Sequence, residues 1–430
     1  MIRPIALVAL SLVASPALAD AVTYKGTIGN ASIVMELSED PAEATGELFG
    51  RYFYTDKGVD IPLHQTTASR SKLALAEEVP CDEKLNNCPH AQDDPPRDPP
   101  LGAGWELSID RSGNLKGKFT LNGRNRTVDL LRVGTRPYDP AEGLQGLSSF
   151  ASGLFWQGTT LTAESSPYDF LKVADHPLKQ LGSVELAHGT ARYWVDDRTK
   201  FQFPRIADIG DADDVPANDY LQQRHWMMSL DALYCAAQIY QGFGWNGYNF
   251  DAGTLGWWDE EQVVVHYLSP TVMTWMESGS LSCGGAHPYN HAEYYNLDVQ
   301  SGLPLDLSRI FKGWVAKDYD GKIVDLETAR ANPRDYQWQP DADLAAFVKA
   351  HRPSDEELGL TGGEDGCPMD ELIDTNLMIG FKGDDRVVFA LGGLPHVIQA
   401  CGQDLVEAPI TELGELLTPE AAEYFPVLNS

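Results

Sequence analysis

Two histidines and a glutamate with the chemistry to bind a metal ion lie close together in the sequence: His287, His291 and Glu293. On a helix, histidines four residues apart can share one zinc ion. Here Pro288 and the glycine pair before it disfavour a helix. In a strand, residues four apart are separated by about 13 Å, too far for one ion. The spacing therefore predicts no metal site, and we expect the His287 ring to hydrogen-bond to backbone groups of the turn.

No set of residues in the sequence has a recognisable catalytic signature. Ser280, Ser282, His287 and Asp298 are the residue types of a hydrolytic triad, but the Gly-x-Ser-x-Gly turn that presents a serine nucleophile is absent. A triad is recognised by its geometry, and these residue types occur in any long chain. We therefore predict no catalytic residue and no cofactor. A thiol nucleophile is also disfavoured, because all six cysteines can pair.

Aromatic residues are concentrated in two stretches, residues 243–250 and 257–258. Glycines between the rings indicate loops, where aromatic side chains stack on sugars or anchor a protein interface. The alternative is that the rings fold back into the core. We predict a ligand-binding surface made by these rings and by the turn after Cys283, with these candidate residues: Trp245, Tyr248, Trp257, Trp258, Gly284, Gly285, His287 and Tyr289.

The first nineteen residues have the features of an export signal. Arg3 supplies the positive charge, residues 5–13 the apolar run, and residues 17–19 a small-residue cleavage site that ends at Ala19. The apolar run is well below the roughly 20 residues that a membrane-spanning helix needs. We expect cleavage after Ala19, a periplasmic or secreted protein, and no membrane span in the mature chain.

An exported chain with six cysteines is expected to form disulfides. Cys81 and Cys88 enclose a short polar loop and are expected to pair with each other. The remaining four cysteines allow three connectivities. Of these we favour Cys235–Cys283 and Cys367–Cys401, because each pair joins neighbouring segments of one domain. A zinc site made of cysteine thiolates is the weaker alternative, since no Cys-x-x-Cys pair is present.

The chain is strongly acidic, with a formal net charge of -31 from 63 acidic and 32 basic residues. This balance disfavours nucleic acid and anionic membrane surfaces as partners and would attract a basic protein. The alternative explanation is solubility alone.

The N-terminal part of the chain, residues 20–135, is predicted to be an all-β module. Short alternating stretches bounded by turn residues predict its strands. Residues 81–100 interrupt them with two cysteines and a proline-rich acidic loop, which cannot be a central strand. The predicted strands are residues 22–29, 31–37, 46–54, 59–63, 105–109, 114–121 and 126–131.

A second, α+β domain is predicted over residues 155–430, which gives the whole chain an α+β fold class. Its longest helix is expected to begin at Asn218 as N-cap and to end near Gln241. This helix is apolar on most sides, so it should be buried against an antiparallel sheet. The expected strands of that sheet are residues 262–268, 271–279, 291–297, 377–381 and 387–390.

An ordered series of motifs in this domain resembles a known family. The series is Cys-Gly-Gly-Ala-His-Pro at residues 283–288, a strand ending in Asp298, a turn at residues 299–302, and Leu-Asp-Leu-Ser-Arg-Ile-Phe at residues 305–311. It resembles the C-terminal domain of the lysozyme-sensing anti-sigma-factor ectodomain, a domain of unknown function that also accompanies a peptidoglycan deacetylase. The likeness covers roughly residues 260–312 and 374–417.

This resemblance implies an exported, non-enzymatic binding protein of the cell envelope, with lysozyme or another envelope protein as partner. A strongly acidic chain is electrostatically suited to a cationic lysozyme. Peptidoglycan fragments are the other expected ligand class. The alternative function is a cell-wall-directed hydrolase, since the family's domain occurs beside a deacetylase, although this chain lacks that enzyme's metal-binding motifs.

Overall fold

The computed structural model describes residues 19–44, 46–69, 71–81, 88, 98–148, 159–245, 253–256, 261–284, 288–360 and 366–429. The chain forms two compact units. The first extends to Lys172 and also includes Tyr240–Trp245, and the second contains most of the rest of the chain.

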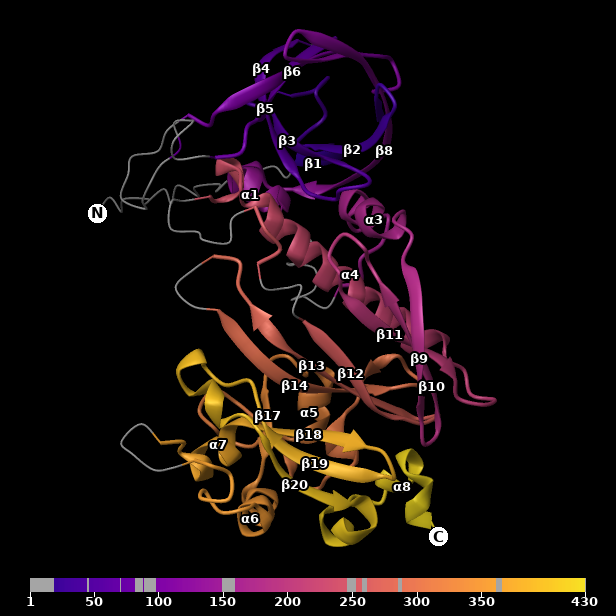
Figure 1. Cartoon of the computed structure of the whole chain (residues 1–430), viewed down its shortest axis with the longest axis vertical. Coiled ribbons are helices and arrows are strands. Elements are labelled where there is room, and N and C mark those ends of the chain that lie inside the picture. The colour runs from indigo at the N-terminus through magenta and orange to yellow at the C-terminus, as the bar shows by residue number, and fades with distance from the viewer. Residues whose placement is uncertain are drawn as a thin grey trace, which may run out of the picture. The chain divides into compact units, whose positions relative to one another are not determined.

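The first unit contains a closed, eight-stranded antiparallel barrel (Figure 1). Pairing of β1 with β8 closes the barrel, so it has no open sheet edge. Along β2, Ile33, Met35 and Leu37 point into its apolar core and Glu36 points outward. The strands are β1 (Ala19–Ile28), β2 (Ala31–Leu37), β3 (Phe49–Tyr54), β4 (Ile61–Ser69), β5 (Lys72–Glu78), β6 (Leu101–Ile109), β7 (Leu115–Leu121) and β8 (Arg124–Tyr138).

The module is thus all-β, as predicted, but barrel closure and β5 are not part of the sequence prediction. The β5 sequence, Lys-Leu-Ala-Leu-Ala-Glu-Glu, consists of good helix formers. In the barrel, Leu73 and Leu75 of this strand face the core, so burial of alternate side chains outweighs local propensity. Among its described residues the unit also has the α-helices α1 (Gly143–Ser148) and α3 (Pro167–Ala174), the latter ending just beyond it.

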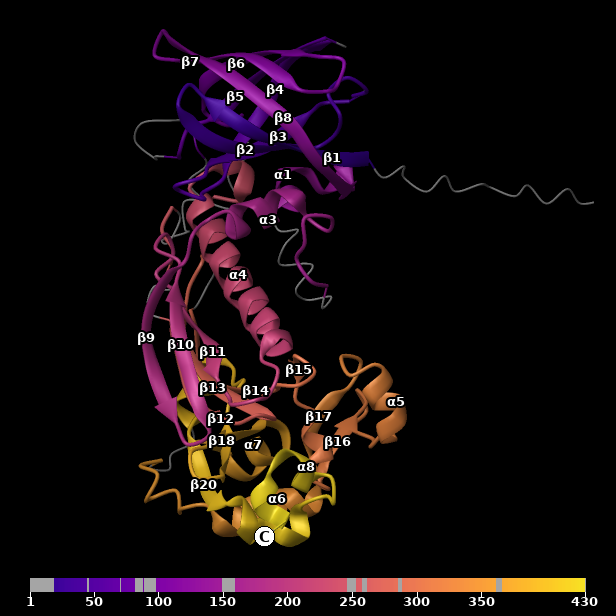
Figure 2. The ribbon, with the colours of Figure 1, turned by 90° about the vertical axis from the view of Figure 1, so that its right-hand side faces the viewer.

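The second unit begins with a three-stranded sheet and the long helix α4 (Val215–Ala237) (Figure 2). The sheet has the order β11 (Gln202–Asp208), β10 (Gly189–Val195), β9 (Lys179–Leu186). As predicted, α4 is buried, and Leu221 and Met228 belong to the same apolar cluster as Trp275. The predicted helix start is wrong, because α4 begins three residues before Asn218. The Asn218 amide instead bonds both backbone groups of Ile206 in β11, at 2.8 and 3.1 Å.

The remaining strands form three further antiparallel sheets, not the single sheet predicted from the sequence. The first three predicted strands do share a sheet, with the second paired to both of the others, whereas residues 377–391 belong to a different sheet that covers another apolar core. The first sheet has the order β12 (Gln262–Leu268), β13 (Val272–Leu281), β14 (Tyr289–Asp298), β15 (Leu303–Pro304). The others are β16 (Trp314–Lys317) with β17 (Gln337–Pro340), and β18 (Leu377–Lys382), β19 (Arg386–Leu391), β20 (Asp404–Pro409).

The helices that accompany these sheets are short and lie after β16. They are α5 (Leu326–Ala331), α6 (Ala342–His351), α7 (Met369–Asn376) and α8 (Ala421–Tyr424). Asp341 caps α6, because its carboxylate accepts hydrogen bonds from the backbone N–H groups of Asp343 and Leu344.

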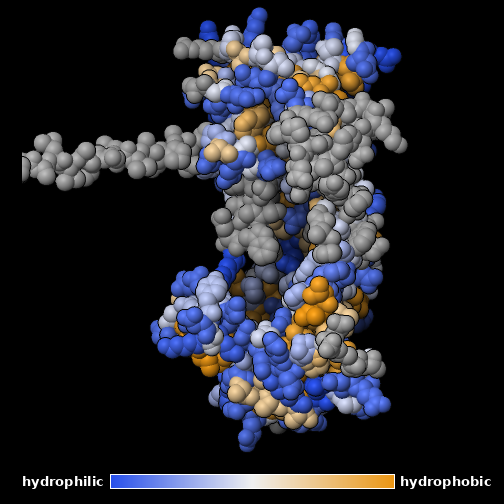
Figure 3. All heavy atoms as spheres, turned by 90° about the vertical axis from the view of Figure 1, so that its left-hand side faces the viewer, coloured by the Kyte–Doolittle hydropathy of each residue, from blue (hydrophilic) through white to orange (hydrophobic). Residues whose placement is uncertain are grey.

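Three disulfides crosslink the chain: Cys81–Cys88, Cys235–Cys283 and Cys367–Cys401. These are the favoured pairs, and they fit an exported protein. No helix of the described ranges is long and apolar enough to cross a membrane. The face of the molecule in Figure 3 is mainly hydrophilic, with scattered hydrophobic patches in both units.

Candidate functional site

The structure describes three of the eight predicted binding residues: Trp245, Gly284 and Tyr289. Trp245 is a half-buried residue of the first unit. Gly284 and Tyr289 belong to the second unit, where Gly284 lies shortly after β13 and Tyr289 is the first residue of β14. The remaining predicted residues lie outside the described ranges: Tyr248, Trp257, Trp258, Gly285 and His287.

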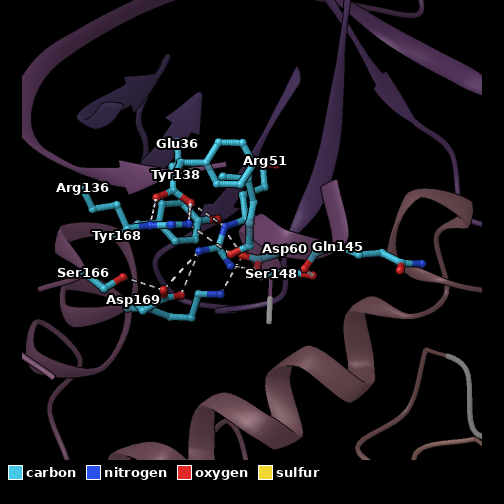
Figure 4. Close-up of polar contacts among 12 residues, drawn as sticks. Glu36, Arg51, Asp60, Arg136, Tyr138, Gln145, Ser148, Ser166, Tyr168 and Asp169 are labelled. Atoms are coloured by element: carbon cyan, nitrogen blue, oxygen red, sulfur yellow. Dashed lines mark hydrogen bonds and ion pairs between the residues drawn. The ribbon is translucent and has the colours of Figure 1, made fainter. Parts of the chain in front are cut away.

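A conspicuous polar cluster of the first unit lies on the outer wall of the barrel, under α3 (Figure 4). We call it the barrel clasp and define it by six buried charged residues: Glu36, Arg51, Asp60, Arg136, Asp169 and Lys172. Arg51 contacts three carboxylates, those of Glu36 at 2.9 Å, Asp60 at 3.2 Å and Asp169 at 3.1 Å. Its guanidinium also stacks on the ring of Tyr168 at 4.0 Å.

The other charges of the barrel clasp are paired as well. Arg136 bonds to Glu36 at 2.8 Å, and the Lys172 ammonium donates to Asp60 at 2.6 Å. Burial alone would raise the pKa of the Asp169 carboxyl, but Arg51, Lys172 and Arg136 outweigh it and hold that pKa below its usual value. Three acids balance three bases, so the barrel clasp is a structural element that fixes α3 to the barrel and presents no group to a ligand.

A second buried polar cluster lies on the β12–β14 sheet, and it differs from the barrel clasp. His291 of β14 is the cross-strand neighbour of Gly279 in β13. A Cβ at Gly279 would lie 2.5 Å from Glu261 Oε2, so the glycine makes room for this carboxylate. Glu261 Oε1 and His291 Nε2 are 2.9 Å apart, and both side chains are almost fully buried.

Two more glutamates lie along the same face of β13 and β14. Glu277 accepts two hydrogen bonds from Arg224 of α4, each 2.7 Å long. Glu293, the cross-strand neighbour of Glu277, accepts hydrogen bonds from the hydroxyls of Tyr289 at 2.5 Å and Tyr295 at 2.8 Å. We call Glu261, Glu277 and Glu293, together with Arg224 and His291, the glutamate cluster.

The glutamate cluster contains buried polar atoms that have no hydrogen-bond partner among the described residues. These are Glu261 Oε2 and His291 Nδ1. An unpaired buried acceptor costs free energy, so such an atom calls for a partner such as an ordered water or a ligand group. The cluster also contains three carboxylates for one guanidinium and one imidazole. Its chemistry therefore suits a ligand that brings hydrogen-bond donors or positive charge.

Burial and neighbouring charges shift the pKa values of both groups in the Glu261–His291 pair. Burial raises the pKa of the Glu261 carboxyl, and the hydrogen bond from His291 only partly offsets this. Burial would lower the pKa of His291, but the hydrogen bond and charge of Glu261, with Glu293 and Glu277 nearby, raise it overall. The imidazolium form is therefore favoured when Glu261 is ionised.

The one group of described residues with metal-ligand spacing is His176, Asp196 and Asp197 in the second unit. Arg198 already bonds to both oxygens of Asp196, at 2.7 to 3.0 Å. Lys179 donates to Asp197 at 2.5 Å. Basic side chains thus take the place that a cation would occupy, and we assign no metal to this group.

Comparison with known proteins does not test the resemblance to the anti-sigma-factor ectodomain. No family model matches this chain, and no curated protein is significantly similar to it. From the sequence, His291 and Glu293 are considered only as candidate metal ligands, and that possibility is disfavoured. Nothing in the sequence points to Glu261, which lies directly before β12. One signal was available, because the alternation of Tyr289, His291, Glu293 and Tyr295 places four polar or aromatic side chains on one face of a strand.

Proposed function

We propose that this protein is an exported, non-enzymatic binding protein of the cell envelope that recognises a basic partner protein, with lysozyme as the partner type that the resemblance implies. The partner contacts Tyr289 at the start of β14 and brings a cationic side chain toward the glutamate cluster. The observation that carries this proposal is the pair of unpartnered buried atoms on Glu261 and His291, beside carboxylates that outnumber the cations.

Three further observations support it. Tyr289 is 43% exposed and stacks on the His291 ring, with ring centroids 5.4 Å apart, so it presents an aromatic surface above the cluster. The Cys235–Cys283 disulfide ties the same end of β13 to α4, which holds the binding residues in place. The net charge of -31 favours fast encounter with a basic partner.

The test is binding of the purified mature chain to immobilised hen-type lysozyme, with tyrosine variants to locate the contact. Tyr289→Ala is expected to weaken binding at least about tenfold, as for an aromatic residue that anchors an interface. Tyr319→Ala is the matched control, because Tyr319 is 90% exposed on another loop of the same unit. Equal loss in both variants, or none in either, would contradict the proposed contact.

A cell-wall-directed hydrolase is the second candidate, and one observation favours it. A carboxyl whose pKa is raised by burial can act as a general acid, and Glu261 is such a group. Glu261→Gln would then abolish release of fragments from peptidoglycan while leaving lysozyme binding measurable. If the wild-type protein releases no fragments, the hydrolase is excluded.

A further inference from the structure

Two arginines of the second unit lie directly opposite each other in neighbouring strands. Arg192 of β10 and Arg205 of β11 are cross-strand partners, so their Cβ atoms are about 4.5–5.5 Å apart. Both side chains are half-buried. Like charges in this position destabilise a sheet, so the pair lowers the stability of the fold unless a negative charge lies nearby.

Neither arginine has a carboxylate partner among the described residues. The one side-chain hydrogen bond of Arg192 is to the Ser183 hydroxyl of β9, at 3.3 Å. Arg205 donates from Nη1 to the backbone oxygen of Pro204 at 2.8 Å, and its Nη2 is buried and finds no partner in the described part of the chain. The chain has 63 acids for 32 bases, so a lack of carboxylates does not explain this arrangement.

The neighbouring groups of α4 do not neutralise the pair either. His225 faces the same strand, with Nε2 3.2 Å from the backbone oxygen of Phe201 and its ring stacked on Phe203. Burial, together with the charge of Arg205, lowers the pKa of His225 to about 3, so this ring is uncharged. Burial likewise lowers the pKa of Arg205 to about 9. Asp196, the carboxylate whose charge acts on His225, is itself bonded to Arg198, so the buried Arg205 guanidinium has no acidic partner among the described residues.

We propose that Arg205, with Arg192 opposite it on the neighbouring strand, forms an oxyanion-binding site for a phosphate or carboxylate group. A guanidinium binds such groups through two parallel N–H donors, and Arg205 Nη2 is a buried donor without a partner. Trp194 is half-buried and lies two residues after Arg192 on the same strand, so its ring can contact the rest of a ligand that carries the anion. This site is independent of the proposed function, because it uses none of the residues of the glutamate cluster.

The experiment measures binding of inorganic phosphate, and separately of citrate, to the mature chain by calorimetry and by the rise in Tm relative to sodium chloride of equal ionic strength. The variants are Arg192→Gln, Arg205→Gln and the control Lys312→Gln, which removes a positive charge from an exposed residue of the same unit. We expect binding of at least one probe, weakened at least about tenfold in both arginine variants and unchanged in the control. The preferred probe distinguishes a phosphate from a carboxylate ligand.

The stability of the unliganded variants separates this site from a structural role. If Arg192 and Arg205 have no structural ion-pair partner, replacing either one removes a like-charge repulsion and should leave Tm unchanged or raise it. Replacing a residue that takes part in a structural ion pair lowers Tm instead. Loss of anion binding with unchanged or higher Tm supports the site. Absence of binding by the wild-type chain, equal binding by all variants, or a lower Tm in both arginine variants would overturn it.

Discussion

Glu261 Oε1 and His291 Nε2 lie 2.9 Å apart on the buried face of the β12–β14 sheet, and within the described ranges each side chain has a second polar atom without a partner. The two residues are 30 positions apart in sequence. Cross-strand pairing of His291 with Gly279, which has no side chain, brings them together. The pair therefore depends on the register of β13 and β14, and its protonation should be measurable in the stability of the fold.

The first prediction concerns pH. The pKa of His291 is raised in the folded state, so its stabilising contribution is complete below its usual value near 6.5 and is lost as the pH rises through the raised pKa. The raised pKa of Glu261 acts in the same direction, from its unfolded value near 4.5 upward. The free energy of unfolding, measured in urea, should therefore fall as the pH rises above the unfolded pKa of Glu261 near 4.5, and fall further as it rises above that of His291 near 6.5.

The Glu261→Gln/His291→Gln double variant should lose most of this fall, because neither glutamine titrates. His351→Gln, at an exposed histidine of the same unit, should retain it. An unchanged pH dependence in the double variant would show that the Glu261–His291 pair is not its source.

The second prediction concerns the barrel clasp. Arg51→Met should lower the free energy of unfolding of the first unit by about 3–5 kcal/mol, because it leaves three buried carboxylates without their shared partner. Lys57→Met is the control, since Lys57 is 72% exposed and its ion pair with Asp56 contributes little. Urea unfolding measures both variants, and equal costs would contradict the structural role of the barrel clasp.

The third prediction concerns the disulfides. Cys367 and Cys401 are 34 residues apart, whereas Cys81 and Cys88 are only 7 apart. In the chain-entropy model, removal of these bridges costs about 4 and about 2.5 kcal/mol respectively. Replacement of each pair by serines, followed by urea unfolding, should therefore show the larger loss for Cys367–Cys401. The reverse order would mean that the shorter bridge is doing more than closing its own loop.

The fourth prediction concerns Asn218, whose side chain joins α4 to β11. Asn218→Ala removes two hydrogen bonds to Ile206 and leaves the backbone N–H and C=O of Ile206 without these partners. The free energy of unfolding should fall by about 1–3 kcal/mol. Asp214→Ala should cost much less, since Asp214 precedes α4 without making a side-chain cap hydrogen bond. A larger loss at Asp214 in urea unfolding would show that capping, and not the contact with β11, stabilises this end of α4.

Local patterns in the sequence predict the elements of this fold better than their assembly. Alternation and turn residues locate most barrel strands, and the apolar faces of α4 predict its burial. Asn218 shows the limit, because an asparagine near a helix start fits both an N-cap and a tertiary contact, and only the neighbouring strand decides between them. Barrel closure and the separation of β18–β20 from β12–β15 depend on pairings between distant segments that alternation does not encode.

The residues of the candidate site could likewise be predicted only in part from the sequence. The alternation along β14 places His291 and Glu293 on one face, but Glu261 and Arg224 come from a loop end and from α4. Their meeting depends on tertiary packing. The residues of the barrel clasp are likewise far apart in sequence, with Arg51 and Asp169 separated by 118 positions.

The most direct test of the proposed function is binding of the mature chain to lysozyme at low salt, about 20 mM, and at physiological salt, about 150 mM, where screening shortens the reach of exposed charges to about 8 Å. A specific contact at the glutamate cluster predicts binding that persists at the higher salt, because buried or partly buried charges are screened less. Binding that disappears as salt rises, or no binding at either concentration, would contradict recognition of lysozyme and leave the acidic charge as a determinant of solubility.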